Sequence, residues 1–108
     1  MSDQYAKQRI VKDISNNDMR IQVTGYIKSL IDEDIIMLDD KSGEVRVNKA
    51  NIDNFKYKKN DLINVIGDLE FHSDGEKTIN AEIVQDMNKL NFEYYQKIYQ
   101  IRKELDSD

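Results

Sequence analysis

Cysteine and proline are absent from the 108-residue sequence, and histidine occurs once, at His72. Without cysteine the chain has no disulfide framework, no thiolate metal site and no cysteine nucleophile. A single histidine cannot build a histidine metal cluster, and four scattered glycines cannot form a phosphate-binding loop. His72 also lacks a serine or cysteine partner in a recognisable nucleophile motif. We therefore expect no enzymatic activity, no metal and no cofactor.

Long apolar runs are missing as well. The longest contain about four residues, far fewer than the ~20 that a membrane-spanning helix needs. The N-terminus has no basic segment followed by an apolar one, so no signal peptide is expected. These absences predict an intracellular protein without membrane contact, in the cytoplasm or nucleoid, or in the nucleus if the source is eukaryotic.

Because proline and Ser/Gly-rich linkers are absent, the glycines are the main interruptions of the chain. Around them apolar residues alternate with polar ones, which is the pattern of half-buried strands. This pattern predicts five strands, at residues 20–28, 35–38, 44–47, 62–71 and 78–84. Gly25 and Gly67 fall inside strands, where a sharp coil or bulge that lets a small sheet close on itself best explains a glycine.

Five coiled strands, with a short helix or turn between the third and the fourth, describe an all-β, five-stranded OB-fold barrel. We expect this domain to occupy residues 1–87, including an N-terminal extension before Ile14 that runs across the barrel. Residues 88–108 change character and are predicted to form a C-terminal α-helix followed by an acidic tail.

The predicted helix covers residues 89–105, and Asn88 or Asp86 could cap its start. Its first apolar arc is Leu90, Tyr94, Ile98, Ile101 and Leu105, and its second arc is Phe92, Tyr95 and Tyr99. Together the arcs cover about 200° of the circumference, more than the ~100° that a surface helix typically buries. One arc is therefore expected to meet the barrel and the other a partner chain, and the pattern leaves open which arc does which. The predicted partner interface is Leu90, Tyr94, Tyr95, Ile98, Tyr99, Ile101 and Leu105.

The alternative for this helix is that it folds wholly onto its own barrel, with its tyrosines half exposed. A surface helix with a narrower apolar stripe would fit that arrangement better. The width of the two arcs thus favours an oligomerisation element.

The net charge of −5 argues against a protein that coats nucleic acid by charge alone. Residues 46–59 depart from this balance, with five basic residues and one acidic residue. Aromatic rings interleave with the lysines there, a combination that holds the phosphates and bases of single-stranded nucleic acid. The candidate nucleic-acid-binding residues are Tyr26, Arg46, Lys49, Phe55, Tyr57 and Lys58. An ordinary solvated loop, with Phe55 closing one end of the barrel, is the alternative.

The order of these motifs resembles the OB domains of replication protein A, and the end of the chain is similar to the archaeal small subunits. The similar segments are residues 9–15, 19–27, 37–45, 62–69 and 79–86, followed by the tyrosine-rich helix. Lys41 stands where the family's turn commonly has glycine.

The resemblance implies a subunit of the heterotrimer that binds single-stranded DNA in replication, recombination and repair. In that family the subunits join through a bundle of their C-terminal helices, and the smallest subunit mainly assembles the complex. Because no winged-helix domain follows the helix, the smallest, OB-fold-only subunit is the better match. The bundle positions that the resemblance implies are Leu90, Tyr94, Ile98, Ile101 and Leu105.

Two other functions fit the same fold, because OB barrels serve many functions. One is a stand-alone module that binds single-stranded DNA or RNA directly through the candidate nucleic-acid-binding residues. The other is an OB subunit of a telomere-capping or tRNA-type complex.

Overall fold

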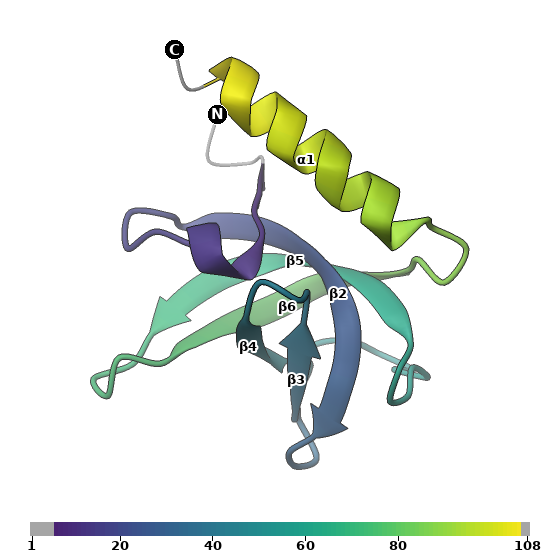
Figure 1. Cartoon of the computed structure of the whole chain (residues 1–108). Helices are drawn as coiled ribbons and strands as arrows, with labels where there is room; N and C mark the ends of the chain where they lie inside the picture. Colours follow the sequence, from purple (N-terminus) through teal and green to yellow (C-terminus); the bar gives the residue numbers. More distant parts are fainter. Residues whose placement is uncertain (1–5, 107–108) are drawn as a thin grey trace.

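Strands paired edge to edge form a closed barrel in the computed structural model, which describes residues 6–106 of the chain (Figure 1). In this part of the chain the barrel strands are β2 (Arg20–Leu30), β3 (Ile35–Asp39), β4 (Glu44–Asn48), β5 (Leu62–Phe71) and β6 (Lys77–Asp86). The chain therefore forms the predicted five-stranded OB-fold barrel with a C-terminal α-helix.

The N-terminal extension adds two short elements that the alternation pattern did not predict. Strand β1 (Lys7–Gln8) pairs in parallel with the start of β2, and a 3₁₀ helix, η2, follows at Val11–Asp13. Val11 and Ile14 pack against the barrel core from this segment. The described part of this extension, residues 6–14, lies against β2 and the barrel core.

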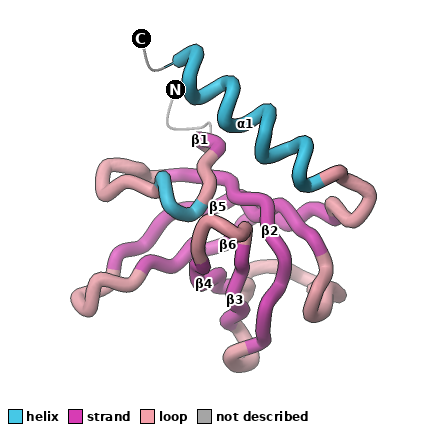
Figure 2. The backbone as a smooth tube through the Cα atoms, viewed as in Figure 1, coloured by secondary structure: helices cyan, strands magenta, loops and turns pink. Residues whose placement is uncertain are grey.

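The barrel closes because β2 is long enough to pair with two strands. Its first part, Arg20 to Tyr26, is antiparallel to β5, and its second part is antiparallel to β3 from Tyr26 onward. On the other side, β4 and β6 pair in parallel through three residue pairs. The smooth trace in Figure 2 shows the same ring of strands beneath the helix.

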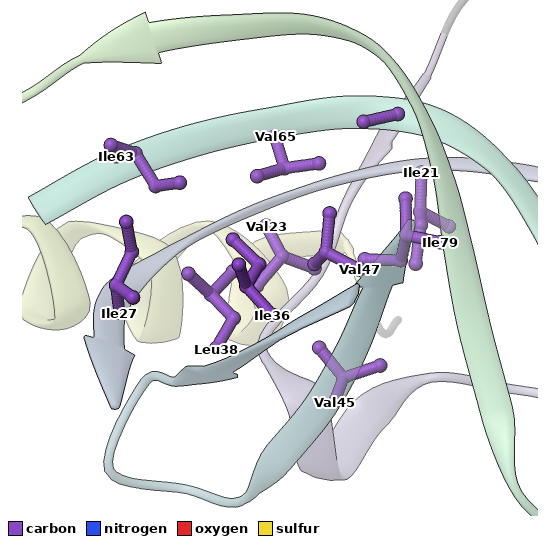
Figure 3. Close-up of a cluster of buried hydrophobic side chains, with 11 residues drawn as sticks. Ile21, Val23, Ile27, Ile36, Leu38, Val45, Val47, Ile63, Val65 and Ile79 are labelled. Atoms are coloured by element: carbon purple, nitrogen blue, oxygen red, sulfur yellow. The ribbon is translucent and has the colours of Figure 1, made fainter. Parts of the chain in front are cut away.

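The apolar residues of the alternating strands point into the barrel, where they form one cluster (Figure 3). Residues such as Ile21, Val23 and Leu38 are fully buried there. Burial of an aliphatic side chain of this size contributes roughly 1.5–3 kcal/mol relative to its exposure, so this cluster is the main source of stability. Its members are Ile21, Val23, Ile27, Ile36, Leu38, Val45, Val47, Ile63, Val65, Ile79 and Ala81.

Gly67 marks the closest approach of β5 and β6. The pairing of these strands shifts register between Ile66 and Gly67, so the predicted bulge is confirmed at this position. A Cβ atom at Gly67 would lie 2.1 Å from the carbonyl oxygen of Asn80, a distance that no side chain tolerates. Glycine is therefore required here by the packing of one backbone against another.

Helix α1 (Phe92–Asp106) begins three residues later than the sequence pattern predicts. Asn91 caps it, since its Oδ1 accepts a hydrogen bond of 3.0 Å from the backbone N–H of Tyr94. The predicted caps serve elsewhere: Asn88 Oδ1 accepts from the N–H of Leu62, and Asp86 Oδ1 accepts from the N–H of Asn88. Residues 107–108 of the predicted acidic tail lie outside the described residues.

Between residues 6 and 106, no helix is long and apolar enough to cross a membrane.

Replacing Gly67 by alanine is expected to lower the free energy of unfolding by about 3 kcal/mol, because the β6 backbone must move away. Gly75→Ala is the matched control, since a Cβ there meets nothing within 4 Å and only the positive φ of 88° opposes it. That change is expected to cost about 1 kcal/mol. Urea unfolding of both variants measures the difference, and equal losses would contradict the close approach at Gly67.

Candidate partner and nucleic-acid interfaces

One face of α1 rests on the barrel through aromatic side chains. Phe92 and Tyr99 are buried, and the ring of Phe92 meets the ring of Tyr26 edge to face, with 5.2 Å between the centroids. Tyr95 stacks on Phe92 at 6.0 Å. The second arc of the sequence pattern therefore faces the barrel.

Long polar side chains complete the contact between α1 and the barrel. Tyr99 donates a hydrogen bond of 2.8 Å to Asp13, and Lys103 donates one of 3.0 Å to the same carboxylate. Gln8 donates to the hydroxyl of Tyr95 at 2.7 Å. These bonds link the helix to β1 and η2, so they fix its position along the barrel as well as its distance from it.

Asp40 lies beneath this contact, and its exposed fraction is only 1%. Its carboxylate accepts hydrogen bonds from the N–H of Val11 at 2.7 Å and from both the N–H and the hydroxyl of Ser42. Its backbone carbonyl accepts a bond of 2.6 Å from Gln96 of α1. A single residue thus joins η2, the turn between β3 and β4, and the helix.

The ionisation of two groups depends on this contact. Burial raises the pKa of the Asp13 carboxyl, but the hydrogen bonds from Lys103 and Tyr99 outweigh burial and hold the pKa below its usual range. Burial, together with the bond to Asp13, raises the pKa of the Tyr99 phenol above its ordinary value. Both shifts favour an ionised Asp13 beside a neutral Tyr99.

The opposite face of α1 exposes the apolar residues of the first arc. The exposed fractions are 63% for Tyr94, 53% for Ile101 and 74% for Leu105. At ~100° per residue these positions lie roughly 140–180° around the helix from Phe92. Ile98 is half-buried, as is Leu90, which precedes the helix. The predicted partner interface is thus divided, and Tyr95 and Tyr99 have to be removed from it because they pack on their own barrel.

The predicted nucleic-acid-binding residues do not form one surface. Phe55 and Tyr57 are half-buried, meet edge to face at 5.2 Å and pack against the core. Lys49 lies 4.9 Å from the centre of the Phe55 ring and donates to the carbonyl of Glu33. Lys58 is exposed and lies 3.8 Å from Asp61. For this loop, the alternative of a solvated segment with Phe55 against the core describes the structure better.

Arg46 lines a cleft on the outer face of β3 and β4, with a cavity volume of about 250 Å³. OB-folds bind oligonucleotides on this face, that of their second and third strands. Its charges are nearly balanced, and the guanidinium of Arg46 lies 4.0 Å from Glu76. The cleft is lined by Val11, Ile14, Met37, Glu44, Val45, Arg46, Gly75, Glu76 and Lys77.

Lys77 is a basic lining residue that the sequence analysis missed. It enters the cleft because β4 and β6 pair in parallel, with Arg46 opposite Thr78. That pairing joins strands from the two halves of the chain, so no local sequence pattern predicts it. Tyr26 lies outside the cleft and lines a separate groove on β2.

These features define a class of protein: a small OB-fold protein whose C-terminal helix is held on the barrel by one face and exposes the other. Residues 5–107 match the family model for Ten1, described as a telomere-capping, CST complex subunit. The chain belongs to this family. No curated protein sequence matches it.

Solved structures share the fold at low sequence identity. The telomere-capping protein Ten1 from S. pombe has a TM-score of 0.73 and 17% identity, with 93% of this chain and 99% of that chain covered. A chain of the S. pombe Stn1–Ten1 complex has a TM-score of 0.76 and 18% identity, with coverages of 94% and 95%.

A replication protein A heterotrimer bound to single-stranded DNA is a more distant neighbour. Its matching chain has a TM-score of 0.56 and 13% identity, and the match covers 79% of this chain and 73% of that one. The resemblance to replication protein A is therefore correct for the kind of subunit and needs correction for the family. The family is the telomere-capping one, which the sequence analysis named as a further alternative.

Removing the hydroxyl of Tyr99 tests the polar contact of α1. Tyr99→Phe is expected to lower the free energy of unfolding by about 1 kcal/mol, because the bond to Asp13 is lost and the ring is kept. Tyr94→Phe is the matched control on the exposed face and is expected to change nothing. Urea unfolding checks both, and equal effects would show that the Tyr99 bond does not stabilise the fold.

Acid should remove the stabilisation that Asp13 provides. Because its folded pKa lies below the unfolded value, the contribution is present above about pH 4 and is lost as the pH falls through the folded pKa. Asp13→Asn is therefore expected to be less stable than the parent chain at about pH 6, with the gap narrowing toward about pH 2.5. Urea unfolding at the two pH values measures the gap, and a constant gap would contradict this assignment.

Proposed function

We propose that this chain is the small subunit of a telomere-capping complex that binds single-stranded DNA, and that it acts by docking the exposed face of α1 onto a second subunit. The observation that carries this proposal is the position of the apolar residues on the helix. Tyr94, Ile101 and Leu105 face away from a barrel that already holds the other side.

A helix that served only its own domain would keep its apolar residues on the barrel side. Here the barrel side uses Phe92 and Tyr99, and the outer side presents a tyrosine, an isoleucine and a leucine to solvent. Contiguous exposed apolar residues on a soluble domain mark interaction sites. The barrel-side contacts hold the helix in place, so a partner would meet a surface that is already ordered.

The partner that we propose is an Stn1-type subunit. One neighbour of the fold is a chain of the S. pombe Stn1–Ten1 complex, and another belongs to a replication protein A heterotrimer bound to single-stranded DNA. Both neighbours support a subunit that works inside an assembly. In a eukaryotic source, we place this complex in the nucleus at chromosome ends. The roles in replication, recombination and repair that the resemblance implies stay predictions.

Placing a charge on the outer face should disrupt the assembly and leave the barrel intact. Ile101→Asp is expected to weaken association with the Stn1-type subunit of the same source by at least about tenfold, because the aspartate would be desolvated in an apolar interface. Gln100→Asp is the matched control: it places the same residue one position away on the flank of the helix and should leave association intact.

Co-purification of the two subunits and a titration of the purified chains measure this effect, with urea unfolding to show that both variants fold. Equal association of the Ile101→Asp variant and the parent chain would refute docking through α1. Point changes are sharper here than deletion of residues 88–108, because deletion would also remove the bond from Leu62 to Asn88 and the packing of Phe92.

A further inference from the structure

A second groove lies on the outer face of β2, away from the cleft on β3 and β4. It has a cavity volume of about 490 Å³, and we call it the lysine groove. One wall is the turn after β3, and the other is the end of the loop before β5. Its lining residues are Tyr26, Ile27, Lys28, Ser29, Asp39, Lys41, Lys59 and Asn60.

Three lysines from three separate elements converge on this groove. Lys28 is paired with Glu44, whereas no carboxylate between residues 6 and 106 forms an ion pair with Lys41 or Lys59. Asp39 is the single acidic residue in the lining, and its carboxylate accepts a bond of 2.7 Å from the backbone N–H of Lys41. The groove therefore has an excess of positive charge in a chain whose net charge is −5.

Tyr26 supplies an aromatic surface among these lysines. Phe92 holds its ring edge to face, with an interplanar angle of 81°, and the ring is half-buried. The ammonium group of Lys41 lies 5.8 Å from the centre of the ring. A ring fixed beside the unpaired Lys41, in a groove that the unpaired Lys59 also lines, is a combination that can hold a base by stacking and its phosphates by charge.

The backbone of Lys41 adopts a conformation that residues other than glycine disfavour. Its φ is 74°, in the left-handed region that favours glycine and that costs other residues about 1 kcal/mol or more. Ser42, bound to the buried Asp40 carboxylate, fixes the turn in this form. A position whose backbone conformation favours glycine thus carries a lysine, and this lysine lines the groove.

We propose that the lysine groove binds single-stranded nucleic acid, with Tyr26 stacking on a base and with Lys41 and Lys59 contacting its phosphates. The cleft on β3 and β4 is the poorer phosphate site, because Arg46 is paired with Glu76 there and a second carboxylate, that of Glu44, also lines it. The exposed residues Tyr94, Ile101 and Leu105 of α1 are not part of the groove lining. This site is independent of the assembly function proposed above.

The test is a fluorescence-anisotropy titration of the full chain with a labelled oligothymidine of about 30 nucleotides, at low and at physiological salt. The Lys41→Gln/Lys59→Gln double variant is expected to bind at least tenfold more weakly. Its salt dependence should fall by about two counterions, one for each lost phosphate contact. Arg46→Gln/Lys77→Gln is the matched control in the other cleft, and its affinity should stay within twofold of the parent.

A second variant distinguishes loss of the positive charge from loss of the folded structure as the cause of weaker binding. Lys41→Gly removes the cation while it relaxes a strained backbone, so it should weaken binding with no loss of stability to urea. Weaker binding by the Arg46→Gln/Lys77→Gln variant alone would move the site to the cleft and overturn the proposal.

Absence of binding by the parent chain at low salt would also overturn the proposal, as would equal competition by polyglutamate, which would mark a site for acidic protein segments. Association of the lysine variants with the Stn1-type subunit should be unchanged, which separates this site from docking through α1.

Discussion

The buried carboxylate of Asp40 is the interaction on which the arrangement of the whole molecule depends. It satisfies the N–H of Val11 and both donors of Ser42, and the carbonyl of the same residue receives Gln96 of α1. A carboxylate that is removed from water needs such partners, because its desolvation is otherwise costly. The N-terminal segment, the turn that carries Lys41 and the helix therefore all bond to one residue, the first two to its carboxylate and the helix to its backbone carbonyl.

Different interactions stabilise the barrel and hold the helix on it. The barrel is held by aliphatic burial, which has no preferred direction and depends on the alternation of side chains along each strand. The helix is held by a few aromatic rings and by directional bonds to Asp13, Asp40 and Gln8. Directional bonds set the rotation of the helix about its axis, and this rotation decides that Ile101 and Leu105 face solvent.

The sequence predicted the barrel well because its signal is local. The alternation alone predicts that Ile21, Val23 and Leu38 are buried, whichever strands pair. The glycine at position 67 likewise predicts the bulge in its own strand. The two arcs of the helix were also visible, but their orientation was not, because it depends on Asp13 and Asp40, more than fifty residues away. The helix cap was misplaced for the same reason: Asn88 serves Leu62, a partner that no local pattern reveals.

The predicted nucleic-acid-binding residues lie apart in the structure because the prediction relied on neighbours in the sequence. Phe55 and Tyr57 are close to several lysines along the chain, yet the fold turns both rings onto the core. The residues that do gather around Tyr26 come from a strand, a tight turn and the end of a loop. The pairing of β2 with β3 brings Lys28 near Lys41, and the bonds of Asn60 and Asp61 to Ile27 add Lys59 from a distant part of the chain.

The pairing of the strands gives α1 one more role. Strands β2, β3 and β4 form one local unit and β5 with β6 a second, and the units meet only along the β2–β5 and β4–β6 seams. The helix follows the second unit in the chain, but Tyr26, Asp13 and Asp40, on which it rests, precede β4. Its contacts with Tyr26, Asp13 and Asp40 therefore tie the second unit back to the first, in addition to the two seams. A partner that holds α1 in place would therefore also oppose separation of the two units of the barrel.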